Sequence, residues 1–268
     1  MKNLPFFSLF VLSFIFLFSF FGAYFYDVDA YLFDANSILL PPSFEHIFGT
    51  DRLGRDVLAR LMEAGKISLI IGLGSAFISS FIGLFLGAMA GYFKGIVDKG
   101  FIILVDLFLT FPTFFLLLAL VSYINASALV LIIIISFTGW MTTARLIRSE
   151  SFKITSQPYI KILNIAKVDK LKILFKYYAP ILAPIYFVSF TFGVGGAILA
   201  ESGLSFLGLG IVAPQISWGT MLSNGKDVIE IAWWVSFFSG VMIFLVTFSL
   251  INISNYLQQI TNKKQIQQ

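Results

Sequence analysis

The chain has 268 residues, of which 58% are hydrophobic and 12% charged, with a mean hydropathy of +0.92 and a formal charge of +4. Soluble domains carry about twice that charged fraction, so this composition excludes a water-soluble globule and predicts an integral membrane protein. The basic residues lie between apolar stretches and form no block typical of a nucleic-acid module, so the expected surroundings are a lipid bilayer and no nucleic acid.

Six apolar stretches are long enough to cross a bilayer, which takes about 20 residues each: 4–26, 68–92, 101–121, 124–144, 180–200 and 232–254. The first could be mistaken for a signal peptide, but its apolar run exceeds the usual length of about 7–15 residues. It is therefore expected to be an uncleaved anchor. Only a short turn at 122–125 joins the third and fourth stretches, which predicts a helical hairpin.

Basic residues predict the orientation of these spans. If the N-terminus is inside, thirteen of the 18 Lys and Arg residues fall on the cytoplasmic side, in segments 1–3, 93–100, 145–179 and 255–268. Because Lys and Arg favour the cytoplasmic side, both chain ends are expected there. The predicted organisation is an anchor and extracytoplasmic segment (1–66), a core (67–255) with a cytoplasmic loop (149–179) and an outer loop (201–231), and a cytoplasmic tail (256–268).

Two outer segments carry more pattern than simple loops do. After Asp56 an apolar face with charges opposite it predicts an amphipathic helix at the outer interface, leading into the second span; its members are Val57, Leu58, Leu61 and Met62. The loop 201–231 is glycine-rich and contains Pro214 and Trp218. It is too long and apolar for a solvated turn, so it is expected to fold back onto the outer mouth.

Small residues recur at every fourth position of the second span, at Ser75, Ser79, Gly83, Gly87 and Gly91. Such residues share one helical stripe and let another backbone approach closely, so they predict a packed face.

Three further residues are candidates for gating or kinking. Pro112 should kink the third span, and Glu201 stands at the end of the fifth. Asp106 is the acid well inside a span. It is either a functional site, as intramembrane carboxylates often are, or a structural residue that reaches the interface or pairs with Lys99, Arg145 or Arg148.

Several kinds of chemistry lack their residues. No G-x-x-x-x-G-K-[ST] phosphate loop is present, cysteine is absent, and His46 is the single histidine. A lone histidine cannot build the imidazole clusters of metal sites, and no paired carboxylates or Ser-His-Asp set can be assembled. No catalytic or metal-binding residues are therefore expected, and the chain is not predicted to be an enzyme.

The cytoplasmic stretch 153–180 combines six lysines with apolar residues at helical spacing. One stripe consists of Tyr159, Ile162, Leu163 and Ala166, and a second, after a turn at 168–170, of Leu171, Leu174 and Tyr178. Two interpretations stay open from spacing alone. The lysines could lie along an anionic membrane surface, or an apolar face could dock into a groove of a cytoplasmic partner.

Four motifs in this order resemble the dipeptide/oligopeptide/nickel family of ABC importer permeases: H-x-x-GTDxLGRDVxxRL at 46–61, DLFLTFP at 106–112, ARLIR at 144–148, and AESGLSFLGLG at 200–210 followed by SWGTML at 217–222. The resemblance covers about residues 45–255. It implies a type I importer permease bundle of six spans in the bacterial inner membrane. It also implies three kinds of partner: a second, related permease, two cytoplasmic ATPase subunits that hold ATP and Mg²⁺, and an extracytoplasmic solute-binding protein.

In that family the loop before the fifth span couples to the ATPase through a pattern close to Y-V-E-A-A-x-x-x-G followed by a proline. Tyr159 and Ile160 match its start, but Lys161 replaces the usual acid and Lys167 the usual glycine. The coupling residues that the resemblance implies are Pro158, Tyr159, Ile160, Lys161, Ile162, Leu163, Ala166, Lys167 and Asp169.

The mechanism implied is alternating access, with the coupling loop as a lever and the spans as the path for dipeptides, oligopeptides or nickel complexes. Two alternatives remain at this stage. An ion-coupled secondary transporter would need more intramembrane ionisable residues than Asp106, and a non-transporting scaffold would not need the long outer loop.

Overall fold

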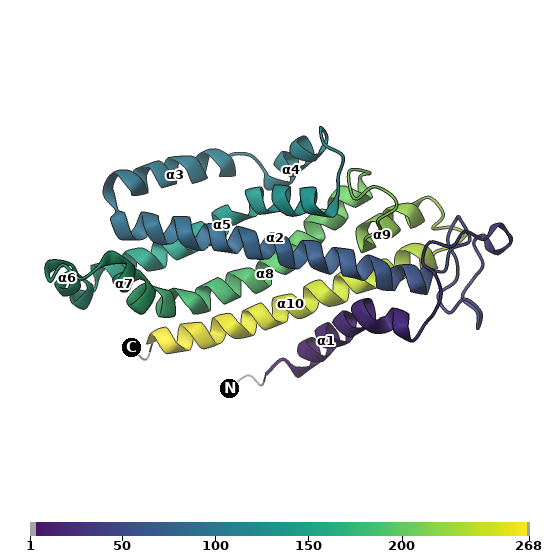
Figure 1. The fold of residues 1–268 in the computed structure, drawn as a ribbon, viewed down its shortest axis with the longest axis horizontal. Helices are drawn as coiled ribbons and strands as arrows, with labels where there is room; N and C mark the ends of the chain where they lie inside the picture. The colour runs from purple at the N-terminus through teal and green to yellow at the C-terminus, as the bar shows by residue number, and fades with distance from the viewer. Residues whose placement is uncertain (1–3, 267–268) are drawn as a thin grey trace.

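The computed structural model describes residues 4–266, with side chains up to residue 262, and within that range the fold is all-helical without a strand. Its long helices lie side by side (Figure 1): α1 (Phe6–Phe21), α2 (Val57–Phe93), α5 (Ala128–Ser156), α8 (Ala179–Phe206) and α10 (Trp234–Ile266). The shorter helices are α3 (Gly95–Leu109), α4 (Thr113–Val121), α6 (Pro158–Ile165), α7 (Lys170–Ile173) and α9 (Trp218–Lys226). Single turns are η1 (Gly22–Tyr24), η2 (Ala35–Ser37) and the π-helical η3 (Leu174–Tyr178).

Five helical segments are long and apolar enough to cross a membrane, and α3 with α4 would make a sixth span that is bent by 76°. This agrees with the predicted all-α membrane bundle. The bend follows Pro112, which precedes α4 and cannot donate a backbone N–H to the preceding turn. The sequence predicted a kink at this proline, and the structure has a full break there.

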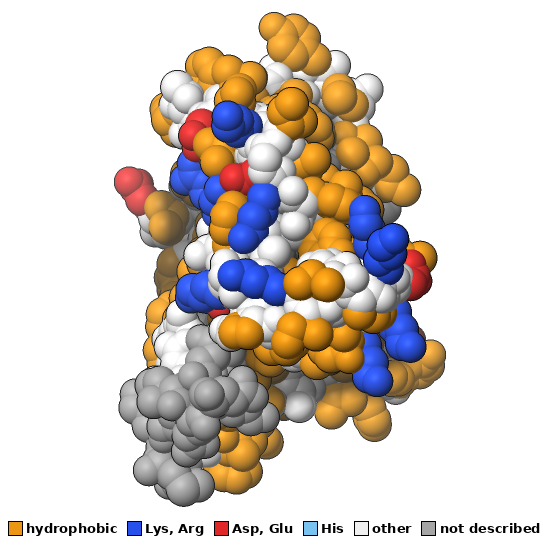
Figure 2. All heavy atoms as spheres, turned by 90° about the vertical axis from the view of Figure 1, so that its left-hand side faces the viewer, with side chains coloured by type: hydrophobic (Ala, Val, Ile, Leu, Met, Phe, Trp, Pro, Cys, Tyr) orange, Lys and Arg blue, Asp and Glu red, His pale blue; other side chains and the backbone are white. Residues whose placement is uncertain are grey.

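The two ends of the bundle differ in construction. One end, the basic end, carries α6, α7 and the C-terminus of α10, and the N-terminus of α1 lies in the same half of the molecule (Figure 1). Figure 2 looks onto this end and shows Lys and Arg side chains spread among apolar ones. The opposite end, the loop end, is built from segments 22–56 and 207–233.

The predicted amphipathic helix at the outer interface is wrong as a separate element. Asp56 caps a helix that runs without a break from Val57 to Phe93, and its Oδ1 accepts a hydrogen bond of 2.9 Å from the Ala59 N–H. The expected polar face is present only in part: Glu63 and Lys66 are partly exposed, whereas Arg60 is only 2% exposed. The reason is a counter-charge outside the helix: Arg60 Nε lies 3.3 Å from Asp51 Oδ2.

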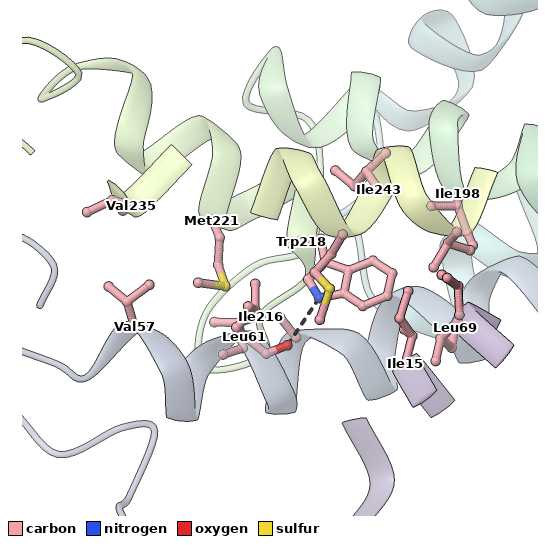
Figure 3. Packing of buried hydrophobic residues seen from close by; sticks show 14 of the residues in the cluster. Ile15, Val57, Leu61, Leu69, Ile198, Ile216, Trp218, Met221, Val235 and Ile243 are labelled. Atoms are coloured by element: carbon pink, nitrogen blue, oxygen red, sulfur yellow. Dashed lines mark hydrogen bonds between the residues drawn. The ribbon is translucent and has the colours of Figure 1, made fainter. Parts of the chain in front are cut away.

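The loop after α8 returns onto the bundle, as its composition predicted. Trp218 is fully buried at the start of α9, where it packs among Ile15, Ile216 and Ile243 (Figure 3). Its indole Nε1 donates to the Leu61 carbonyl at 3.1 Å, and its backbone N–H donates to Ser68 Oγ at 3.0 Å. These bonds fasten the loop to α2 and fix the loop end.

Candidate functional site

Residues 158–178 at the basic end form a compact helical hairpin, called here the α6–α7 unit. Pro158 is the first residue of α6, a position that suits proline because its N–H would be unpaired there anyway. The helix ends in a complete Schellman motif: Lys167 N–H donates to Asn164 O, and Val168 N–H donates to Leu163 O, both at 3.1 Å. The turn then leads through Asp169 into α7.

Lys167 occupies the residue of this motif that has a left-handed backbone, with φ +53°. Non-glycine residues adopt this conformation at a cost of roughly 1–2 kcal/mol, since Cβ comes close to the following carbonyl oxygen. The resemblance placed a glycine at this position. The lysine therefore forms the same turn that a glycine would favour, but with a strained backbone conformation.

One face of the unit is anchored in the bundle. Ile160 and Ile173 are fully buried and Tyr178 is 1% exposed, in a cluster with Tyr92 of α2, Ile147 and Ile154 of α5, and Leu182 of α8. Tyr92 OH donates to Asn164 Oδ1 at 3.3 Å, and the hydroxyls of Thr155 and Tyr178 lie 2.7 Å apart. The unit is thus joined to three of the long helices.

The other face leaves large apolar side chains uncovered. Ile162 is 64% exposed, and Ile165, which the sequence analysis missed, is 81% exposed. Phe175, also missed, is 76% exposed, and Leu171 is 62% exposed. Exposed lysines surround this face: Lys161, Lys167, Lys170, Lys172 and Lys176.

The predicted coupling residues therefore divide between the two faces. Ile160 belongs to the buried side and Leu163 is half-buried against it, whereas Tyr159, Ile162 and Ala166 are exposed. Their contact with an ATPase stays a prediction. The sequence signal that would have found Ile165 is its place three residues after Ile162, which puts both on the same side of α6.

The small-residue stripe of α2 faces α5. Ser75 and Ser79 are buried beside Ser136 and Gly139 of α5, and Ser136 Oγ donates to Ser75 O at 3.2 Å.

The glycines of the stripe lie even closer to α5. A Cβ at Gly83 would lie 2.9 Å from the Trp140 carbonyl oxygen. Added Cβ atoms at Gly87 and Gly91 would overlap the Ala144 carbonyl and the Ser151 side chain, respectively. The two backbones approach each other this closely because these residues lack large side chains.

Two ion pairs join α3 to α5. Asp106 pairs with Arg145, and both side chains are about half exposed, at 56% and 52%. Asp98 pairs with Arg148, whose Nη2 donates to Asp98 Oδ2 at 2.8 Å; this pair is more enclosed, at 12% and 25% exposure. Of the alternatives left open for Asp106, the structure shows the pairing with Arg145.

Glu201 is fully buried between α8 and α9. Its Oε1 accepts hydrogen bonds of 2.6 Å from Ser205 Oγ and from Ser217 Oγ, while Oε2 has no partner among the described residues. Ser217 also caps α9 by accepting from the Thr220 N–H at 3.1 Å. Glu201 therefore ties the cap of α9 to α8, and its gating role stays a prediction.

In the motif at 46–61, the buried Asp56 connects segments of the loop end. Asp56 Oδ2 accepts from Tyr26 OH and lies beside His46 Nδ1, both at 3.0 Å. Burial, followed by the hydrogen bond to Asp56, raises the pKa of Tyr26 to about 12. His46 is therefore placed against a structural carboxylate, and no group of His, Asp and Glu that could hold a metal ion occurs among the described residues.

Comparison with known proteins identifies the family. Residues 83–266 match the profile of the binding-protein-dependent transport system inner membrane component family. The chain belongs to this family. It is a permease subunit of an ABC importer in the inner membrane, a multi-pass transport protein and not an enzyme.

Several curated relatives share most of this permease. It is 32% identical to the oligopeptide transport system permease protein OppC of Haemophilus influenzae over 243 residues, which cover 90% of this chain and 78% of that protein. It is 31% identical to the dipeptide transport system permease protein DppC of Bacillus subtilis over 258 residues, covering 96% and 81%. Identity to OppC of Mycobacterium tuberculosis (strain H37Rv) is 33% over 215 residues, covering 80% and 74%.

Proposed function

We propose that this permease imports peptides and that its α6–α7 unit receives the ATPase subunits on the cytoplasmic side. The observation that carries the proposal is the unit's division into two faces. Ile160 and Ile173 anchor it in three long helices, while Ile162, Ile165 and Phe175 remain uncovered on a unit that also carries exposed lysines. An exposed apolar face on a firmly rooted element suits docking to a partner.

The orientation follows from the same end of the molecule. The basic residues gathered around the α6–α7 unit favour the cytoplasmic side, so we place the chain ends inside and the loop end outside. A movement of the ATPase pair would then reach α2, α5 and α8 through the unit's buried side. A second permease completes the path, and a solute-binding protein delivers the cargo to the loop end.

The relatives' names favour peptides as cargo, because they describe oligopeptide and dipeptide transport. Uptake of a labelled dipeptide, a labelled oligopeptide and labelled nickel by a deletion strain complemented with this chain tests that choice. We expect the chain to restore peptide uptake. Restored uptake of nickel with no effect on either peptide would contradict the peptide assignment.

The docking role is tested by Ile165→Asp, which puts a charge on the uncovered face of α6. We expect loss of ATP-dependent uptake and of ATPase subunits that co-purify with the permease. The matched control is Ile96→Asp, at the start of α3, because Ile96 is comparably exposed at 88% against 81%. An Ile165→Asp permease that reaches the membrane and keeps full uptake would contradict the docking role.

A further inference from the structure

The loop end contains a cavity of about 720 Å³ that no assigned role accounts for. It lies between the start of α2, the connection 208–216 and α9. Its volume falls within the range of about 300–1,000 Å³ that is typical of small-ligand sites. On the proposed orientation, it opens on the side from which the cargo arrives.

The charge of the lining is positive. Arg55 and Arg60 are the charged side chains among the described residues that line the cavity. Both lie against one carboxylate, since Asp51 Oδ2 is 2.8 Å from Arg55 Nε and 3.3 Å from Arg60 Nε. One carboxylate cannot neutralise two guanidinium groups. Among the other acids nearby, Asp227 pairs with Arg52 and Glu63 with Lys66, while the buried Glu201 accepts a hydrogen bond from Ser205 of the cavity wall.

Arg60 is held in place with one nitrogen unused. Its side chain is 2% exposed, and Nη1 donates to the Ala30 carbonyl at 3.0 Å. No described residue accepts a hydrogen bond from Nη2. Nη2 is not fully enclosed, and an acceptor that enters the cavity would gain a charge-assisted hydrogen bond to it, which contributes about 1.5–3 kcal/mol. Carboxylates pair with guanidinium groups in this way.

The remaining walls are uncharged and combine polar groups with apolar residues of the connection 208–216. They carry the hydroxyls of Tyr31, Ser205, Thr220 and Ser223 and the amides of Gln215 and Asn224. The hydroxyls of Ser205, Thr220 and Ser223 donate within the protein and can accept from a peptide N–H. The side chains of Tyr31, Gln215 and Asn224 can donate as well as accept. The cavity therefore combines one fixed positive wall with uncharged walls that carry both hydrogen-bonding and apolar groups, which suits a short peptide with a free C-terminus.

We propose that this cavity is a recognition site for the α-carboxylate of the transported peptide, with Arg60 and Arg55 as the residues that bind it. The inference rests on the proposed function and names a subsite for its cargo. It assigns part of the peptide selectivity to the permease, in addition to any selectivity of the binding protein.

The test compares a labelled peptide with its C-terminal amide, which keeps the size and removes the charge. ATP-driven uptake of both is measured with the full transport complex in proteoliposomes, using the same binding protein throughout. Arg60→Gln should lower the acid-to-amide uptake ratio by at least about tenfold, since a charge-assisted hydrogen bond contributes about 1.5–3 kcal/mol. Selectivity that arises in the binding protein cancels from the comparison between permease variants.

A second variant tests the same site without changing a buried residue. Asn224→Asp is nearly isosteric, and Asn224 is an exposed residue of the cavity wall, so the change adds a repelling charge without disturbing packing. It should lower the same ratio. The matched control is Arg52→Gln, which removes an exposed arginine at the loop end outside the cavity lining and should leave the ratio unchanged.

Each outcome has one meaning. An unchanged ratio in both Arg60→Gln and Asn224→Asp would overturn the proposal. Equal losses for acid and amide, with more binding protein needed for half-maximal uptake, would also overturn it and assign the arginines to an acidic side chain of the binding protein. A wild-type complex with no ATP-driven peptide uptake would instead contradict the proposed function.

Discussion

The loop end and the basic end of this permease handle charge and apolar surface in opposite ways. At the loop end Asp51, Asp56 and Arg60 are buried and hydrogen-bonded, and Trp218 is enclosed by three helices and a loop. At the basic end the lysines are exposed, and so are Ile165 and Phe175. The loop end is thus built to hold one arrangement of its segments, and the basic end to present a surface to a partner.

The largest expected contrast between the ends comes from removing one aromatic ring at each. Trp218→Ala should lower the free energy of unfolding by about 3–5 kcal/mol, because it empties a packed site and removes the indole hydrogen bond to the Leu61 carbonyl. In the permease without its ATPase subunits, Phe175→Ala should change it by less than about 0.5 kcal/mol, since that ring is 76% exposed. Denaturation in detergent measures both, and equal effects would contradict the comparison.

Between the two ends, the α2–α5 contact should not tolerate a methyl group added at Gly87. Gly87→Ala would place Cβ against the Ala144 carbonyl and force α5 away, at a cost of about 1–3 kcal/mol. Gly100→Ala in α3 is the matched control, because no atom lies within 4 Å of the added Cβ. It should stabilise the permease by about 0.5–1 kcal/mol. Thermal unfolding measures both variants: the unfolding temperature should fall for Gly87→Ala and rise for Gly100→Ala.

The two ion pairs of α3 show how burial changes the contribution of an ion pair to stability. Asp98→Asn should destabilise by about 1–3 kcal/mol, because it leaves the enclosed Arg148 without its carboxylate. Asp106→Asn should cost less than about 1 kcal/mol, because both members of its pair are about half exposed. The ranking is read from unfolding midpoints, and a larger effect at Asp106 would point to a role for that residue beyond pairing with Arg145.

The smallest expected effect lies within the α6–α7 unit. Lys167→Gly should stabilise the end of α6 by about 0.5–1 kcal/mol. Glycine adopts the positive φ of this position without strain, but it also raises the conformational entropy of the unfolded chain, which reduces the gain. Lys161→Gly, inside α6, should destabilise it by about 1 kcal/mol. Hydrogen exchange of the α6 amides reports both changes, and slower exchange in Lys161→Gly would contradict the assignment.

Hydropathy and residue spacing were sufficient to predict the spans, the small-residue face of α2 and the position of the α6–α7 unit. They could not predict the burial of Arg60, because its counter-charge comes from Asp51, nine residues earlier in an irregular segment. Nor could spacing identify Ile160 as the anchor of α6. Apolar residues occur on both sides of that helix, and only its packing against α2 and α5 shows which side is covered.

The central claim is that the uncovered face of the α6–α7 unit receives the ATPase subunits. The chain contains no cysteine, so Ile165→Cys and Ile96→Cys each provide a single thiol for a short cross-linker in the membrane-embedded complex. We predict cross-links from position 165 to an ATPase subunit, strengthened by a non-hydrolysable ATP analogue, and none from position 96. Cross-links from position 96 with none from position 165 would contradict the claim.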